Sequence, residues 1–194
     1  MSKNARIQNL NRFAQLAKIG EIVFHTDDLA NLWRITNKNT LYTTIKRYVG
    51  QGLLFRIYKG FYGIMPSREI DPYLLGVKAL HRYAYVSCET VLREEGIIQQ
   101  ELSAITLVSS ETKRFSIAGN NYYSRKLADK FLYQQKGIAV ADRGVRKANA
   151  ERAIADLLYF NPHAYFDARN LIDWKKVRDL QKELGYPLTP ERYG

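Results

Sequence analysis

The chain has 194 residues, 46% of them apolar, and 30 Lys and Arg against 19 Asp and Glu give a formal net charge of +11. This composition predicts a chain folded throughout, and the charge favours a polyanionic partner without choosing between DNA, RNA and an anionic membrane. Because no run approaches the ~20 apolar residues of a membrane span and the lone Cys88 cannot form an internal disulfide, we expect a cytoplasmic protein without membrane association.

The positive charge is concentrated near the N-terminus. Residues 1–70 hold 11 basic and 4 acidic side chains, a net of +7, whereas residues 71–194 hold 19 and 15, a net of +4. The forty residues from Leu29 to Arg68 contain no Asp or Glu. This division predicts a basic DNA-binding domain over residues 1–70 and a second domain over residues 71–194.

The N-terminal domain is predicted to begin with a helix over residues 4–18, where apolar side chains recur at helical spacing until Gly20. A short β-branched segment follows at residues 22–24. Thr26 is expected to cap a second helix over residues 27–35, because acidic side chains occupy its first turn.

A third helix is predicted after the polar break at residues 36–39. One face of this helix is apolar and consists of Leu41, Ile45, Tyr48 and Val49. The opposite face carries side chains that can reach base edges and phosphates, namely Asn39, Thr40, Tyr42, Thr43, Lys46 and Arg47. Gly50 and Gly52 end the helix.

A hairpin is predicted to follow, with strands at residues 53–58 and 61–65 joined by a turn at Lys59-Gly60. This order of elements is typical of a winged helix-turn-helix, whose third helix enters the major groove. The expected backbone and minor-groove contacts lie on or beside the wing and around the third helix, at Arg34, Lys38, Arg56, Tyr58, Lys59 and Arg68. A basic surface helix and a protein-docking module are the alternatives to DNA binding.

The second domain is predicted to be α+β with a small sheet. Helices are expected over residues 72–82, from a Ser87 cap to Glu95, over residues 149–160, and from an Asp173 cap to Gly185. Short strands are expected at residues 104–108, 115–117, 121–123, 130–133 and 137–140, with a turn at Gly119-Asn120.

A catalytic or metal site is not indicated by the sequence. His25, His81 and His163 lack Cys or His at ligand spacing, and no phosphate-loop, dinucleotide-binding or nucleophile-elbow motif is present. The segments 109–111 and 142–151 are the best remaining catalytic candidates. We expect a protein that is not an enzyme and that needs no cofactor or metal.

The segment from Arg143 to Arg152 is rich in cations, with Arg146 and Lys147 between them. It is either a solvated face or an auxiliary nucleic-acid contact. At the start of the predicted helix, Glu151 and Arg152 are also placed to satisfy backbone groups and the helix macrodipole.

Three segments, taken in order, resemble the AbiEi-type antitoxin family. Gly52–Arg56 followed by Lys59–Tyr62 resembles the wing of these proteins. Tyr85–Leu92 with Gly96-Ile97 resembles the segment after their second-domain entry helix, and Ala150–Leu158 resembles their later Glu-Arg/Lys-Ala helix. The resemblance spans about residues 27–160 and departs from the family pattern at residues 142–149.

The resemblance implies an antitoxin of a toxin-antitoxin or phage-defence operon. Such a protein represses its own promoter through the winged helix and opposes a nucleotidyltransferase-like toxin with or without direct contact. The expected DNA partner is the double-stranded promoter with inverted repeats, which many winged-helix repressors bind as pairs, although no long heptad repeat in this sequence predicts a dimer helix. Only the wing positions Arg56, Lys59, Gly60 and Tyr62 are carried over from the family. The alternatives are a winged-helix regulator with a ligand- or protein-sensing second domain, and a nucleic-acid-processing enzyme.

Overall fold

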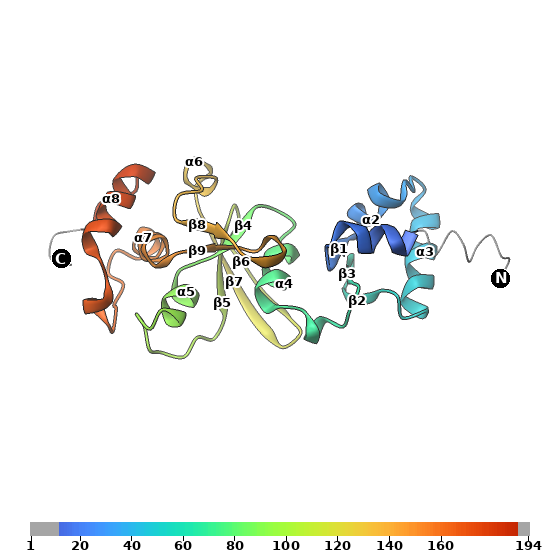
Figure 1. The fold of residues 1–194 in the computed structure, drawn as a ribbon, viewed down its shortest axis with the longest axis horizontal. Helices are drawn as coiled ribbons and strands as arrows, with labels where there is room; N and C mark the ends of the chain where they lie inside the picture. The colour runs from blue at the N-terminus through green and yellow to red at the C-terminus, as the bar shows by residue number, and fades with distance from the viewer. Residues whose placement is uncertain (1–11, 190–194) are drawn as a thin grey trace. The chain divides into compact units, whose positions relative to one another are not determined.

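The computed structural model describes residues 12–189, apart from the side chain of residue 142, and contains both helices and sheets (Figure 1). The chain divides into two units, Met1–Asp71 and Pro72–Gly194. None of the helices in the described part reaches the length and apolarity that a membrane crossing requires.

The N-terminal unit begins with a helix over residues 12–19, which confirms part of the predicted first helix; residues 4–11 lie outside the described residues. It continues with β1 (Val23–His25), α2 (Thr26–Trp33), α3 (Lys38–Gly50), β2 (Phe55–Tyr58), β3 (Phe61–Gly63) and the 3-10 helix η1 (Ser67–Glu69). The strands form an antiparallel sheet in the order β1-β3-β2.

The core of this unit joins the helices to the sheet. Its buried side chains come from the three α-helices, from β1 and β3, and from the loop before β2: Leu16, Phe24, Leu29, Trp33, Leu41, Ile45, Tyr48, Leu54 and Tyr62. Fully burying one such side chain stabilises a fold by about 1.5–3 kcal/mol. The apolar periodicity of α3 therefore fixes which of its faces is turned inward.

Two details of α2 differ from the sequence prediction. The N-cap is His25 rather than Thr26, and its backbone N–H donates to the Asp28 carboxylate at 2.7 Å in a capping box. The helix ends at Trp33 rather than Ile35, because Arg34 adopts a left-handed conformation with φ 52°.

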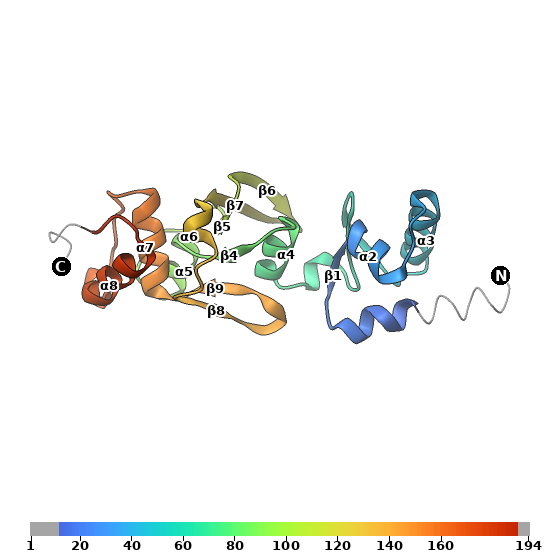
Figure 2. The same ribbon diagram turned by 90° about the horizontal axis from the view of Figure 1, so that it is seen from above.

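The C-terminal unit contains a six-stranded mixed sheet in the order β6-β7-β5-β4-β9-β8. Its elements are α4 (Pro72–Ala79), β4 (Ala84–Val86), α5 (Glu89–Glu94), β5 (Ile105–Ser109), β6 (Lys113–Ile117), β7 (Asn120–Lys126), α6 (Asp129–Leu132), β8 (Ile138–Val140), η2 (Asp142–Gly144), β9 (Arg146–Ala148), α7 (Ala150–Phe160), η3 (Arg169–Leu171) and α8 (Trp174–Leu184). Figure 2 shows the β8–β9 hairpin at the edge opposite β6.

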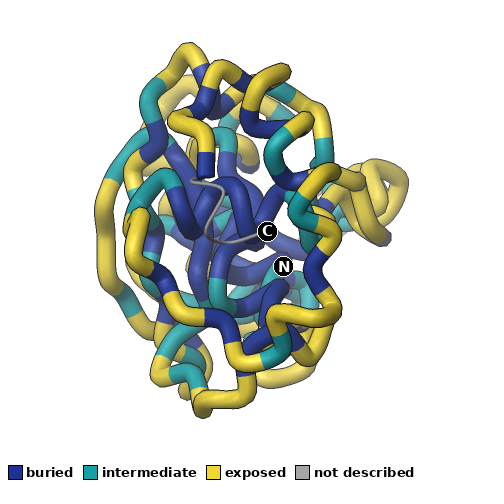
Figure 3. Tube along the Cα trace, turned by 90° about the vertical axis from the view of Figure 1, so that its left-hand side faces the viewer, coloured by how far each residue is buried: buried dark blue, intermediate teal, exposed yellow. Residues whose placement is uncertain are grey.

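The helices cover both faces of this sheet. Tyr122 of β7 donates to the Pro72 carbonyl at 2.9 Å and so packs on the α4 side. Arg125, three positions further along β7, contacts Glu89 of α5 and the Phe160 ring of α7 on the other side, because even- and odd-numbered positions of a strand point to opposite faces. Figure 3 shows that buried and exposed stretches alternate along the chain.

Two interior strands of the sheet, β4 and β9, are absent from the sequence prediction. β4 pairs antiparallel with β5 and parallel with β9, and all three of its residues are buried. A three-residue strand buried on both faces has no alternation of polar and apolar residues that could identify it. β9 lies inside the cationic segment, where the charged side chains give no indication that the backbone pairs with β4 and β8.

Four local predictions in this unit differ from the structure. Residues 130–133 belong to helix α6 rather than a strand, because Phe131 and Leu132 are both buried in one helical turn. The cap position before α5 is Cys88 rather than Ser87. The β6–β7 turn consists of Ala118 and Gly119, one position earlier than predicted, both with positive φ. The helix predicted over residues 72–82 ends at Ala79.

The caps of the last two helices have the geometry that their sequences require. Asn149 accepts from the Arg152 backbone N–H at 2.9 Å at the start of α7. Asp173 accepts from the Lys176 backbone N–H at 3.0 Å, which confirms it as the cap of α8.

Gly76 of α4 is required by the close approach of Tyr122. A Cβ at this position would lie 2.5 Å from Cε1 of the buried Tyr122 ring. Gly76→Ala is therefore expected to lower the free energy of unfolding by about 1–3 kcal/mol, despite the better helix propensity of alanine. Urea titration followed by circular dichroism measures this change. An equal or raised stability would show that Tyr122 can move aside.

Candidate nucleic-acid interface

Helix α3 is begun by an Asn cap. The Asn37 side chain accepts from the Thr40 backbone N–H at 3.0 Å and from the Thr40 hydroxyl at 3.3 Å. The buried face that follows consists of Leu41, Thr44, Ile45 and Tyr48. This packing leaves the opposite side of the helix in solvent.

The exposed face of α3 carries four of the predicted residues at helical spacing, Asn39, Tyr42, Thr43 and Lys46. Tyr42 is the largest of them, and 54% of its surface is exposed. Lys38 and Thr40 are exposed at the start of the helix, but the Thr40 hydroxyl is held by the cap. Arg47 is half-buried, at the border between the exposed and buried faces.

The Tyr48 hydroxyl, on the buried face of α3, is influenced by positive charges. Burial raises the pKa of the Tyr48 hydroxyl above its ordinary value, and the charges of Arg12 and Arg47 oppose this shift. The Tyr48 hydroxyl is therefore within the electrostatic influence of both arginines.

The turn between α2 and α3 places Arg34 outside the core. Its left-handed backbone allows its N–H to reach the carbonyls of Ala30 and Asn31 at the end of α2. The Arg34 side chain is exposed, four residues before the first residue of α3. It is thus available to a ligand that lies against this turn.

The β2–β3 hairpin exposes alternate side chains. Arg56 and Tyr58 are exposed on β2, and Lys59 is exposed in the turn. The turn is held on the start of α2, because the Gly60 carbonyl accepts from the Thr26 backbone N–H at 2.9 Å and from its hydroxyl at 3.3 Å. Thr26, expected to cap α2, positions the hairpin turn.

Arg68 is set apart from the other predicted residues. It lies in η1, after the hairpin, with a highly exposed side chain 3.8 Å from the Glu69 carboxylate. That neighbouring charge partly cancels its own. The structure therefore brings Asn39, Tyr42, Thr43 and Lys46 together on one helix face, whereas Arg68 belongs to a separate segment.

The C-terminal unit contains a buried ion pair that the sequence did not suggest. Arg152 and Asp156, one turn apart on α7, are both fully buried, with the Arg152 Nε 2.9 Å from an Asp156 oxygen. The remaining guanidinium N–H groups donate to the carbonyls of Gln134 and Lys136, both at 3.0 Å, and to the hydroxyls of Tyr85 at 2.8 Å and Tyr186 at 3.4 Å. All five N–H groups of an arginine are thereby used.

The Asp156 carboxylate is equally saturated. One oxygen accepts from Arg152 and from the Tyr186 hydroxyl at 2.8 Å, and the other accepts from the hydroxyls of Tyr85 at 3.0 Å and Ser87 at 2.7 Å. Burial, followed by the negative charge of Asp156, raises the pKa of Tyr85 well above its ordinary value. The hydroxyl therefore stays protonated and donates, and no group of the cluster is left for a substrate.

The cationic segment before α7 is divided by the fold. Arg143 is exposed, whereas Arg146 lies over the Tyr83 ring at 4.8 Å and Lys147 pairs with Glu94. Arg152 is buried in the ion pair. These four cations do not form one exposed surface.

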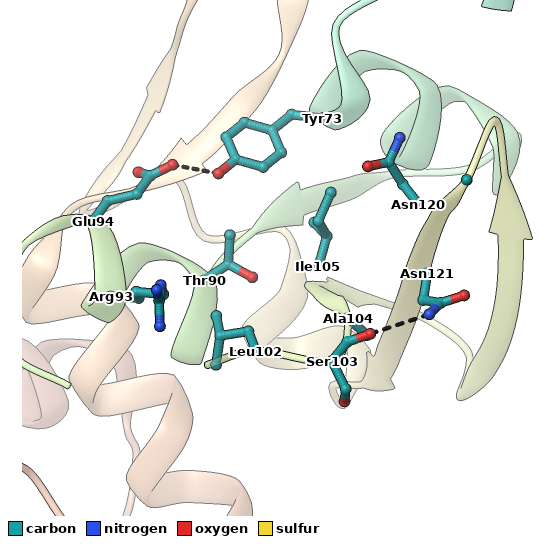
Figure 4. A pocket seen from close by; sticks show the side chains of 11 residues that line it. Tyr73, Thr90, Arg93, Glu94, Leu102, Ser103, Ala104, Ile105, Asn120 and Asn121 are labelled. Atoms are coloured by element: carbon teal, nitrogen blue, oxygen red, sulfur yellow. Dashed lines mark hydrogen bonds between the residues drawn. The ribbon is translucent and has the colours of Figure 1, made fainter. Parts of the chain in front are cut away.

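A pocket of about 470 Å³ lies between α4, α5 and the β6–β7 turn (Figure 4). Its charged side chains are engaged within the protein: Glu94 with Tyr73 and Lys147, and Arg93 with the carbonyls of Gln99 and Gln100. Asn121 donates to the Ser103 carbonyl at 3.3 Å. The charged side chains of the lining are therefore held by partners within the protein.

Metal ligands do not gather in the described part of the chain. Over residues 12–189, no three His, Cys, Asp or Glu side chains are close enough to hold an ion. The catalytic candidates at 109–111 also have structural partners: the Ser109 hydroxyl lies 2.7 Å from that of Ser124, and Glu111 lies 3.4 Å from Arg82.

Comparison with known proteins shows a similarity to a solved structure. No family model and no curated protein matches the chain. Among solved structures, the crystal structure of the RV2827C protein from Mycobacterium tuberculosis is similar, with a TM-score of 0.51 and 14% identity, over 90% of this chain and 70% of that one. At this identity the similarity concerns the fold alone.

Proposed function

We propose that the N-terminal unit is a winged helix-turn-helix that binds duplex DNA. The order of its elements supports this proposal, because α2 and α3 are joined by a short turn and followed by an antiparallel hairpin that serves as the wing. In this arrangement α3 is the recognition helix.

The exposed face of α3 is the observation that carries the proposal. Asn39 and Thr43 offer hydrogen-bonding groups of the length that reaches base edges, and Lys46 offers a cation on the same face. Lys38 stands in the first turn, where a cation opposes the helix macrodipole, so its charge does not serve the stability of the helix. A phosphate-contacting role accounts for its position.

We infer further that the protein represses its own operon and acts as an antitoxin against a nucleotidyltransferase-like toxin. The resemblance of three segments to AbiEi-type antitoxins supports this role. The saturated Arg152–Asp156 cluster also favours a C-terminal unit that binds a partner over one that performs chemistry, because its buried charges are fully used in holding the fold.

The variant Lys38→Ala plus Lys46→Ala is expected to weaken binding to the promoter upstream of the gene by about tenfold and to reduce the salt dependence of binding by about one to two released ions. Gel-shift titration over a range of salt concentrations measures both. The matched control, Lys175→Ala plus Lys182→Ala, removes the same charge from exposed positions on α8. Equal affinities of the two variants would remove α3 from the DNA interface.

The antitoxin role is tested separately by co-expression. We expect a nucleotidyltransferase encoded beside this gene to stop growth when it is expressed alone, and growth to be restored when the full-length protein is present. The α3 variant should retain this protection, since the two roles are assigned to different units. Failure of the wild-type protein to restore growth would contradict the antitoxin role and leave DNA binding unaffected.

A further inference from the structure

A second acid-free basic segment lies in the C-terminal unit. Residues 112–128 contain no Asp or Glu and carry Lys113, Arg114, Arg125 and Lys126. They form the β6–β7 hairpin, in which β6 is an edge strand that pairs only with β7 among the described residues (Figure 2). The hairpin thus concentrates positive charge at a sheet edge.

Nearby carboxylates leave most of this charge uncompensated. Glu89 forms an ion pair with Arg125, and Glu111 lies 3.4 Å from Arg82. Lys113, Arg114 and Lys126 are exposed. Because neighbouring residues of a strand point to opposite faces, Lys113 and Arg114 flank the free edge from its two sides.

Arg114 is held in place by an aromatic ring. Its guanidinium carbon lies 3.9 Å from the centre of the Tyr123 ring, directly across the strand pair. Arg125 lies over Tyr123 at 5.4 Å and over Phe160 at 5.5 Å, so the Tyr123 ring contacts two guanidinium groups. A stacked guanidinium loses little freedom on binding and keeps its N–H edge open for two parallel hydrogen bonds to a phosphate.

The surface suits a nucleic acid better than a protein. A protein interface needs an apolar centre, and none of the exposed large apolar side chains in the described part of the chain lies between residues 112 and 128. Nucleic-acid interfaces are more polar and far more positively charged. Cations also discourage pairing between sheet edges, but that purpose does not require a guanidinium fixed on a ring.

We propose that the β6–β7 edge is a second nucleic-acid contact, which binds backbone phosphates through Arg114, with Lys113 and Lys126 as flanking cations. The contact is independent of base sequence, because phosphates carry no sequence information. It also does not depend on α3.

The variant Lys113→Ala plus Arg114→Ala, in the full chain, tests this contact. We expect its affinity for a short fluorescein-labelled duplex of scrambled sequence to fall by about tenfold, and the salt dependence to decrease by about one to two released ions. Fluorescence anisotropy between about 50 and 200 mM salt measures both quantities. The charge-matched α8 variant, Lys175→Ala plus Lys182→Ala, should bind like wild type; the same loss in both variants would mean that only net charge matters and would overturn the proposal.

Two further probes separate other anionic partners. Unchanged duplex binding with lost binding to phosphatidylglycerol vesicles would assign the edge to a lipid surface, and unchanged duplex binding with lost binding to polyglutamate would assign it to an acidic protein. Either result overturns the proposal. Repeating the measurement in the Lys38→Ala plus Lys46→Ala background should give the same fold-change, which separates this edge from the α3 interface.

Tyr123 is assigned a positioning role and has its own test. Tyr123→Leu should weaken duplex binding several-fold without changing the salt dependence, because Arg114 is loosened but its charge remains. Tyr123→Phe, which keeps the ring, should bind like wild type. Thermal melting shows whether each variant is folded. Lys126→Ala removes one positive charge from the edge and leaves the contact between Arg114 and Tyr123 unaltered, so it measures the contribution of that charge to duplex binding.

Discussion

Asp156→Ala is expected to lower the free energy of unfolding of the C-terminal unit by about 3–5 kcal/mol. The substitution leaves the guanidinium of Arg152 fully buried without its counter-charge and leaves the hydroxyls of Ser87, Tyr85 and Tyr186 without their acceptor. A loss of this size is a large fraction of the stability of an ordinary domain.

Hydrogen exchange resolves where this loss occurs. Peptides from β4 and α7 should lose protection, whereas peptides from α3 should keep it, since the two units have separate cores. Asp179→Ala, at an exposed position on α8, is the matched control and should leave the protection unchanged.

The double variant Arg152→Met plus Asp156→Leu distinguishes charge from packing. We expect it to be more stable than Asp156→Ala alone, because no unpaired charge remains in the interior. If the double variant is the less stable of the two, the guanidinium contributes mainly through its bonds to the carbonyls of Gln134 and Lys136.

Gly137→Ala is expected to lower the free energy of unfolding by about 2–4 kcal/mol, as the sum of left-handed backbone strain and a steric clash. Gly137 has φ 74°, and a Cβ there would lie 2.7 Å from the Arg152 Cβ and 3.0 Å from the Asn149 side-chain oxygen that caps α7. Neither atom can move without shifting the start of the helix.

Gly96→Ala is the control that measures left-handed backbone strain without a steric clash. Gly96 has φ 71°, and nothing lies within 4 Å of a Cβ built there. Urea denaturation should therefore show a loss of only about 1 kcal/mol, from strain alone. Similar losses in the two variants would indicate that the Arg152 region adapts to the added methyl group.

The face of α3 shows how far sequence periodicity reaches. The predicted apolar residues Leu41, Ile45 and Tyr48 are buried, and Asn39, Tyr42, Thr43 and Lys46 are exposed. The prediction of these two faces is correct because a helix with one apolar stripe can bury that stripe in only one orientation. Arg47 was predicted on the exposed face, and its half-buried place at the border was decided by the packing around Tyr48.

The C-terminal unit shows which features sequence periodicity does not predict. Arg152 and Asp156, separated by one helical turn, have the spacing of an ordinary surface pair, and Arg152 was interpreted as a helix-end or solvent-exposed charge. Their burial depends on Tyr85, which precedes Asp156 by 71 residues, and on Tyr186, which follows it by 30. The sequence prediction likewise does not identify Lys113, Arg114 and Lys126 as one surface. This surface depends on the register between β6 and β7, which places Arg114 over the Tyr123 ring.

The sequence by itself determined the helices with strong periodicity, the hairpin after α3, the cap at Asp173 and the basic character of the N-terminal unit. Each of these depends on residues within a few positions of one another, so local backbone preference and spacing suffice. Only the tertiary structure decided which charges are exposed and which strands occupy the interior of the six-stranded sheet. It also decided that Arg152 and Asp156 of α7 form an ion pair in the interior of the C-terminal unit. Those outcomes depend on partners far apart in the chain, because the free energy of a charge is set by what surrounds it after folding.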